Sequence, residues 1–219
     1  MQTTDDLTPT PIPMSADSSA SEEAGTPAKP EPGGFMIRAG ARLIDWVVTF
    51  CVGFVAAVVL GLGAGIYRAM TGADLSLFFK SLQETGVISW VGGMIGVVAY
   101  HTFAEGIAGA TIGKRILGLQ VCDISLGPCR IGQAFKRSLA FFFDALFFGL
   151  VAERYMSDSP MKQRAGDHWA DTVVVKRRSV PTHRSGLRFL AGSMTAVFVQ
   201  GTVAIVTHLA QFAWILWAG

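Results

Sequence analysis

Three charged residues, Arg38, Arg42 and Asp45, stand at the entrance of a long apolar run over residues 46–66. A helix turns about 100° per residue, so these three side chains fall within about 40° of one another and form one polar seam. The run that follows carries no charge over the roughly twenty residues that cross a bilayer core. A carboxylate at this position suits proton or cation exchange, or an ion pair that fixes helix register. We therefore predict a polar membrane site.

The same spacing of arginine, alanine and aspartate recurs at Arg137, Ala140 and Asp144. Two helices that enter the membrane from one face would each hold the aspartate about 10 Å deeper than the arginine. We expect either crossed pairing, of Arg38 with Asp144 and of Arg137 with Asp45, or one shared cluster of all four. Chance is the alternative explanation, because only three positions in eight match.

A third candidate position is Asp167, which follows Arg164 by three residues and precedes a β-prone segment. It has two possible roles. It either caps or pairs locally at the membrane surface, or it closes a polar cluster with Arg38 or Arg137.

Two basic residues, Lys114 and Arg115, follow Gly113 in a glycine-containing stretch. A phosphate-binding loop needs four residues between its glycines and a Ser or Thr after the lysine, whereas three residues separate Gly109 from Gly113. A nucleotide site is therefore not expected. We predict instead that Lys114 and Arg115 lie against anionic lipid headgroups.

The composition places these residues in an integral membrane protein, since 51% of the 219 residues are hydrophobic and 16% are charged. The three cysteines, Cys51, Cys122 and Cys129, form no paired motif and have no histidine at zinc spacing, so neither a metal nor another cofactor is expected. No nucleophile or metal-protease motif occurs, so we do not expect an enzyme. We also expect no nucleic-acid partner.

Three apolar segments, 38–66, 87–103 and 189–219, are predicted to span the membrane as helices. The apolar segment 139–152 covers only about 20 Å as a helix, which is short of the roughly 30 Å core, and both its flanks are basic. We predict a re-entrant or interfacial helix there, with a fourth crossing as the alternative. Two β-prone segments, 116–124 and 172–176, are expected to pair outside the membrane. The predicted class is thus an all-α membrane protein with a small strand pair.

The chain divides into four parts. Residues 1–33 form an acidic tail rich in Pro, Ser and Thr that is expected to be disordered. Residues 34–178 form the membrane domain, 179–188 a linker and 189–219 a terminal membrane helix. Basic segments 106–136 and 153–188 are predicted to be cytoplasmic, which places the N-terminus inside and both loop 67–86 and Gly219 outside.

Three motifs in this order resemble the RDD family of prokaryotic membrane proteins, named for one arginine and two aspartates. The first covers residues 34–45, the second Thr111 to Val121 and the third Gln163 to Val175. The resemblance covers most of 34–178 and leaves the final span outside. The family usually has a glycine before the threonine of the third motif, where this chain has Asp171, which leaves open whether the same tight turn forms.

The resemblance implies a multi-spanning domain of the bacterial inner membrane whose activity is mostly unassigned, with transport, including cation/proton exchange, proposed for some members. We expect transport of a small ion or solute, with Asp45 and Asp144 as exchanging carboxylates. Three spans are few for a complete pathway, so this function needs a homo-oligomer. The alternative is a non-catalytic scaffold in which the Arg/Asp pairs are structural.

Overall fold

The computed structural model describes residues 29–84, 86–146, 150–180 and 186–218. Within these ranges, nothing is stated of the side chains of residues 143–146, 150, 151 and 218, so the predicted role of Asp144 lies outside the described side chains. Most of the predicted tail, 1–33, also lies outside the described residues.

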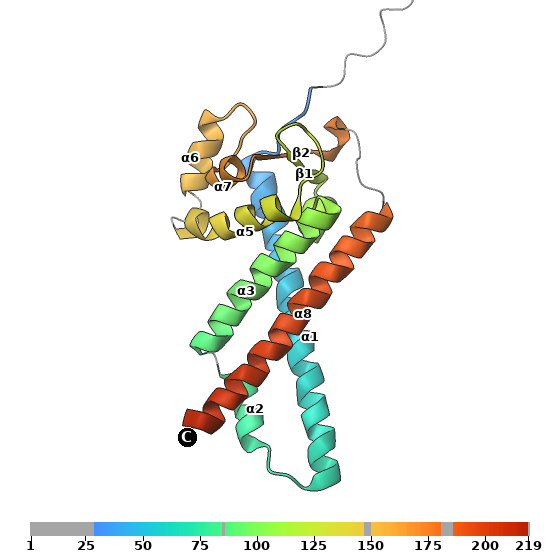
Figure 1. The fold of residues 1–219 in the computed structure, drawn as a ribbon, viewed down its shortest axis with the longest axis vertical. Helices are drawn as coiled ribbons and strands as arrows, with labels where there is room; N and C mark the ends of the chain where they lie inside the picture. Colours follow the sequence, from blue (N-terminus) through green and yellow to red (C-terminus); the bar gives the residue numbers. More distant parts are fainter. Residues whose placement is uncertain (1–28, 85, 147–149, 181–185, 219) are drawn as a thin grey trace, which may run out of the picture.

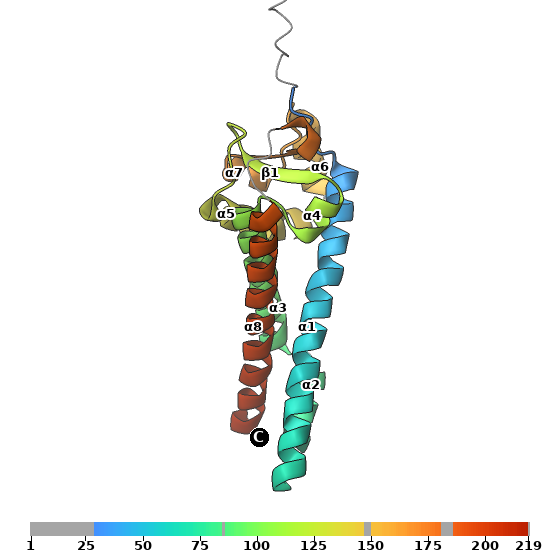
Figure 2. The same cartoon turned by 90° about the vertical axis from the view of Figure 1, so that its right-hand side faces the viewer.

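Three long helices run side by side and form the apolar part of the molecule (Figures 1 and 2). They are α1 (Phe35–Thr71), α3 (Val87–Phe103) and α8 (Gly186–Ala218). A π-helical turn, η1 (Ala104–Ala108), continues α3. In the described part of the chain these are the three helices that are long and apolar enough to cross a membrane. The prediction of three spans is confirmed.

The first span is longer than predicted and ends at Thr71. Gly72 stops the helix by adopting a left-handed conformation, with φ 71°, and its N–H donates to the carbonyl of Arg68. The chain then forms the short helix α2 (Ser76–Gln83) before it turns back into α3. The segment 67–86 is therefore partly helical.

Glycines on α3 let α8 pack closely against it. A Cβ atom at Gly92 would lie 2.0 Å from Oγ1 of Thr207, and one at Gly96 would lie 2.6 Å from Oε1 of Gln200. Small residues of this kind allow two membrane helices to approach closely. Gly93, in contrast, faces open space, so it takes no part in this packing.

The remaining elements gather at one end of the three helices, and we call this part the head (Figures 1 and 2). Its two strands, β1 (Leu119–Asp123) and β2 (Thr172–Lys176), pair antiparallel, with Leu119 opposite Lys176. The predicted strand pair is confirmed. The first strand begins later than expected, because residues before it form the helical turn α4 (Ile112–Ile116). The other head helices are α5 (Ile131–Leu146), α6 (Leu150–Asp158), α7 (Ala165–Trp169) and the 3₁₀ turn η2 (Arg177–Ser179).

The helix α5 starts at Ile131, eight residues before the predicted segment 139–152, and it lies across the end of α3 rather than along it (Figure 1). Residues 147–149, between α5 and α6, lie outside the described part. The expectation that the two Arg/Asp repeats enter the membrane as parallel helices is therefore wrong. A helix that lies across the bundle cannot hold its arginine and aspartate at the depths of those on α1.

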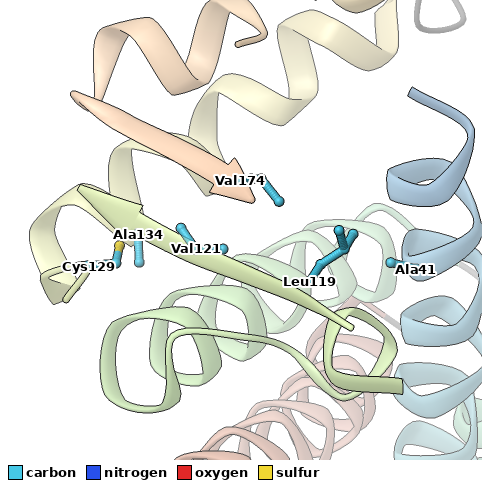
Figure 3. Packing of buried hydrophobic residues seen from close by; sticks show 6 residues of the cluster. All are labelled: Ala41, Leu119, Val121, Cys129, Ala134 and Val174. Atoms are coloured by element: carbon cyan, nitrogen blue, oxygen red, sulfur yellow. The ribbon is translucent and has the colours of Figure 1, made fainter. Parts of the chain in front are cut away.

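A buried apolar cluster attaches the head to α1. Figure 3 shows Leu119 of β1 pointing toward Ala41 of α1, with Val174 of the neighbouring strand beside them. Val121, Cys129 and Ala134 extend the cluster to the start of α5. This packing brings the charged residues of α1, the strand region and α5 close together.

Candidate functional site

A network of charged side chains lies where the three long helices meet the head. At its centre Asp167 is fully buried, and its carboxylate contacts three arginines. Nη1 of Arg38 lies 2.6 Å from Oδ2 of Asp167, and Nη1 of Arg137 lies 3.0 Å from Oδ1. Nε of Arg164 lies 3.3 Å from Oδ1. Burial alone would raise the pKa of Asp167, but the three guanidinium groups hold it well below its usual range.

Asp167 also has a local role, because its Oδ2 accepts a hydrogen bond from the backbone N–H of Arg164 at 3.3 Å at the start of α7. The two roles left open by the sequence are thus combined in one carboxylate. It caps its own helix and also contacts Arg38 and Arg137.

A second buried carboxylate, that of Glu105, continues the network. Its Oε2 lies 3.0 Å from Nε of Arg137, and its Oε1 pairs with Nζ of Lys114. Arg137 therefore bridges the carboxylates of Glu105 and Asp167, and its Nη1 also donates to Oγ1 of Thr172 at 2.8 Å. Although burial opposes its charge, these two carboxylates raise the pKa of Arg137 above its ordinary value. Burial lowers the pKa of Lys114 to about 8, and the carboxylate of Glu105 opposes that shift.

Asp45 is buried too, but no cation lies within ion-pair distance of it among the described residues. Its carboxylate instead accepts hydrogen bonds from the hydroxyls of Tyr100, at 3.0 Å, and Thr111, at 2.6 Å. A third bond comes from the backbone N–H of Gly113 at 2.8 Å. Only glycine fits there, because a Cβ atom would lie 2.1 Å from the carbonyl oxygen of Ala41. The close approach of α4 to α1 thus supplies a donor to Asp45.

Arg42 has no carboxylate within ion-pair distance in the described part of the chain. Its Nη1 contacts Nε2 of His101, and its guanidinium carbon lies 3.5 Å from the centre of the Phe141 ring. A guanidinium can only donate, so Nε2 must accept, which makes His101 neutral with its proton on Nδ1. Among the described side chains, Arg42 is therefore the cation of the network with the least compensation from nearby negative charge.

These groups line a cavity of about 410 Å³ between α1 and the head. Its charged wall holds Arg38, Arg42, Asp45, Lys114, Arg137 and Arg164. Its apolar wall includes Phe141 of α5 and Ala152 and Met156 of α6. With Glu105 and Asp167 behind this wall, the described cluster has five cations and three carboxylates. Among the described side chains, positive charge thus exceeds negative charge at this cavity, beside an apolar surface.

The structure brings together most of the residues predicted for the site, but in different pairs. Arg137 binds Glu105 and Asp167 rather than Asp45, so the predicted pairing of Arg137 with Asp45 is wrong. Arg38 binds Asp167, and its predicted pairing with Asp144 lies outside the described side chains. The cause is the orientation of α5, which turns Arg137 into the head and away from Asp45.

The predicted contact of Lys114 with lipid headgroups is also wrong, because its side chain is buried and paired with Glu105. The short helix α4 turns Lys114 inward. Its neighbour Arg115 is partly exposed and lies 4.7 Å from the centre of the Phe189 ring. Contact of Arg115 with headgroups therefore stays a prediction.

Several residues of the site were not predicted as members: Glu105, His101, Tyr100 and Thr111. Glu105 and His101 are separated by four positions, which places them on one face of a helix, and both stand next to an apolar span. That spacing was a usable signal. The contacts that Tyr100 and Thr111 make with Asp45 depend on tertiary packing. In the described part of the chain, no group of three or more His, Cys, Asp or Glu residues could hold a metal ion.

The three sequence motifs meet in this cluster: the first supplies Arg38 and Asp45, the second Gly113 and Lys114, and the third Arg164 and Asp167. No curated protein and no solved structure matches the chain. The family model of the RDD family matches residues 32–219 and so includes the last span, which the motifs alone had left outside. The chain is a membrane protein of the RDD family.

Proposed function

We propose that this domain transports a small ion or solute and that the cavity between α1 and the head is where the solute binds. The observation that carries the proposal is the excess of cations around that cavity, five against three carboxylates among the side chains that the structure describes. An excess of charge in a water-poor site is costly unless a ligand balances it. The solute that this cavity suits best is an anion.

A cation is a poorer fit because two of the three carboxylates are already engaged. Asp167 contacts three arginines, and Glu105 contacts Lys114 and Arg137. Asp45 is the exception, since hydrogen bonds rather than an ion pair hold it. It is therefore the group best placed to exchange a proton during transport, because protonation would increase the positive excess and strengthen the binding of an anion.

The proposed setting is the bacterial inner membrane, with the N-terminus and the head on the cytoplasmic side. The basic segments 106–136 and 153–188 support this orientation, because positively charged loops stay in the cytoplasm. The charged residues of the cluster gather at the head end, and three spanning helices are few for a complete pathway. We therefore propose that transport requires a homo-oligomer.

Ion flux into proteoliposomes tests the proposal. The full-length protein should move chloride or inorganic phosphate faster than protein-free liposomes do. Arg42→Gln should slow this flux about tenfold, the loss expected for one charge-assisted contact. Asp45→Asn should remove any dependence of the flux on a pH gradient. Arg68→Gln is the matched control, because Arg68 is an exposed arginine near the other end of the same helix.

The second candidate function is a scaffold, and one observation favours it. Arg137, Glu105 and Asp167 tie α5, η1 and α7 together through fully buried ion pairs, as a purely structural network would. A scaffold should show no ion movement. Flux of chloride, phosphate, sodium and protons no faster than in protein-free liposomes would reject transport and leave the scaffold.

A further inference from the structure

A second, larger cavity of about 940 Å³ lies between α1 and α3, with α8 as its floor. Its walls include large aromatic residues, with Trp46, Phe50 and Phe54 on α1 and Trp90 on α3. The side chains of Trp46, Phe50 and Trp90 are 57%, 74% and 67% exposed. Since these helices span the membrane, this apolar groove opens toward the bilayer rather than toward water.

The groove and the charged cavity are adjacent. Leu43, Trp46 and Phe141 line both of them. The guanidinium of Arg42 also lies over the ring of Phe141. Arg42 therefore lies beside the end of the groove at Phe141.

We infer that the groove and the charged cavity form one binding site for an anionic phospholipid, with the phosphate beside Arg42 and the acyl chains between α1 and α3. This inference names the ligand of the site proposed above, and it rests on the proposed function only in taking the cavity to be an anion site. Basic pockets between membrane helices are known to hold the headgroups of anionic lipids.

The chemistry of the two cavities favours a lipid over other occupants. A free phosphate would use the cations but would leave the long apolar groove without a ligand. A second copy of the chain could cover the groove, and the experiment below distinguishes it from a lipid. An anionic lipid matches both features, because it joins a negative headgroup to apolar chains in the same order as the two cavities.

Arg42 is the residue that should recognise the headgroup. It is only half-buried, it lines the cavity, and no carboxylate lies within ion-pair distance of it in the described part of the chain. Its guanidinium has five N–H donors, and one nitrogen is engaged by His101, so donors remain for phosphate oxygens.

Glycines in the groove allow a direct test of the acyl-chain site. Gly53 on α1 lines the groove, and a Cβ atom there meets nothing within 4 Å. Gly53→Phe should therefore fill the groove without a clash in the protein. Gly63→Phe is the matched control, because Gly63 lies on the same helix, faces open space and lines neither cavity.

The experiment is native mass spectrometry of the full-length protein in detergent, with added phosphatidylglycerol or phosphatidylcholine. Phosphatidylglycerol should bind at least tenfold more tightly than phosphatidylcholine, and Arg42→Gln should remove about tenfold of that preference. Gly53→Phe should weaken the binding of both lipids, whereas Gly63→Phe and Arg68→Gln should bind like the unchanged protein. Circular dichroism and a melting curve establish that each variant is folded, and Gly53→Leu replaces Gly53→Phe if the larger residue prevents folding.

Three results would overturn the inference: equal binding of the two lipids, no effect of filling the groove, or displacement of phosphatidylglycerol by an equal concentration of inorganic phosphate. A lipid-free dimer that Gly53→Phe dissociates would show that a second copy occupies the groove instead. Selective lipid binding without ion flux would keep this inference and reject transport. Flux of small anions without lipid binding would reject this inference and keep the transport proposal.

Discussion

Nη1 of Arg38 lies 2.6 Å from Oδ2 of Asp167, although 129 positions separate the two residues in the sequence. Arg38 belongs to the first helix of the membrane domain and Asp167 to the short helix α7 in the head. Their contact is therefore a direct link between the spanning helices and the head. The guanidinium of Arg38 also donates to the carbonyl oxygens of Gly33, at 2.8 Å, and Lys162, at 2.8 Å.

Removing the charge of Asp167 should destabilise the protein strongly. Asp167→Asn leaves three arginines around a neutral group, and breaking a buried ion pair on one side typically costs about 3 to 5 kcal/mol. Thermal unfolding in detergent, followed by tryptophan fluorescence, measures the effect. Asp158→Asn is the control, because Asp158 forms an exposed pair with Arg154 that should contribute less than about 1 kcal/mol. Similar melting temperatures for the two variants would contradict a stabilising role of the buried cluster.

The same carboxylate should make stability depend on acid pH. The folded-state pKa of Asp167 is depressed below its value in the unfolded chain, which is about 3.9. Its contribution is therefore fully present above about pH 5 and is lost as the pH falls below about 4 toward the folded-state pKa. The melting temperature should fall over this range in the unchanged protein and should fall less steeply in Asp167→Asn. Parallel curves for the two proteins would show that other groups cause the acid sensitivity.

Glu105 and Lys114 should respond unequally to substitution, although they form one ion pair. Glu105→Gln leaves both Lys114 and Arg137 without that carboxylate and should cost about 3 to 5 kcal/mol. Lys114→Met should cost less, because Glu105 keeps Arg137 and because burial already disfavours the charge of Lys114. Melting curves of the two single variants, recorded side by side, check the order. A larger loss for Lys114→Met would mean that Arg137 does not compensate Glu105.

Two glycine-to-alanine changes should have opposite signs. Gly113→Ala places a Cβ atom 2.1 Å from the carbonyl oxygen of Ala41, so α4 must move and the N–H bond to Asp45 weakens. We expect a loss of about 2 kcal/mol or more, as for other overpacked sites. Gly132→Ala, at an open position in the first turn of α5, should instead stabilise the helix slightly, by less than about 1 kcal/mol. Equal effects in the melting curves would contradict the close approach of α4 to α1.

Asp171 adopts a left-handed conformation with φ 51°, so the chain makes this turn although it lacks the glycine that the family usually has. Aspartate tolerates this conformation better than most residues, but glycine adopts it without strain. Asp171→Gly should therefore leave stability unchanged or raise it slightly. Asp171→Val should lower it by about 1 to 2 kcal/mol, because a β-branched residue is strained there. The melting temperatures of the two variants, compared with that of the unchanged protein, test both expectations. A stabilised Asp171→Val variant would refute the assignment of the turn.

The sequence by itself determined the three spans and the strand pair. Both rest on local patterns: an apolar run of sufficient length satisfies its backbone in a bilayer as a helix, and the segments 116–124 and 172–176 are rich in β-prone residues. The sequence also identified most of the charged residues of the site, because a charge next to an apolar span needs a partner wherever the chain folds.

Only the tertiary structure decided which charges meet. The repeat of Arg38 and Asp45 in Arg137 and Asp144 predicted matched depths, but α5 lies across the bundle, and Arg137 reaches Glu105 and Asp167 instead. Spacing along a helix fixes which side chains share a face, whereas the partners of that face depend on the tilt of the helix and on its neighbours. The tilt follows from packing between distant segments, such as that of Leu119 against Ala41, which no local pattern encodes.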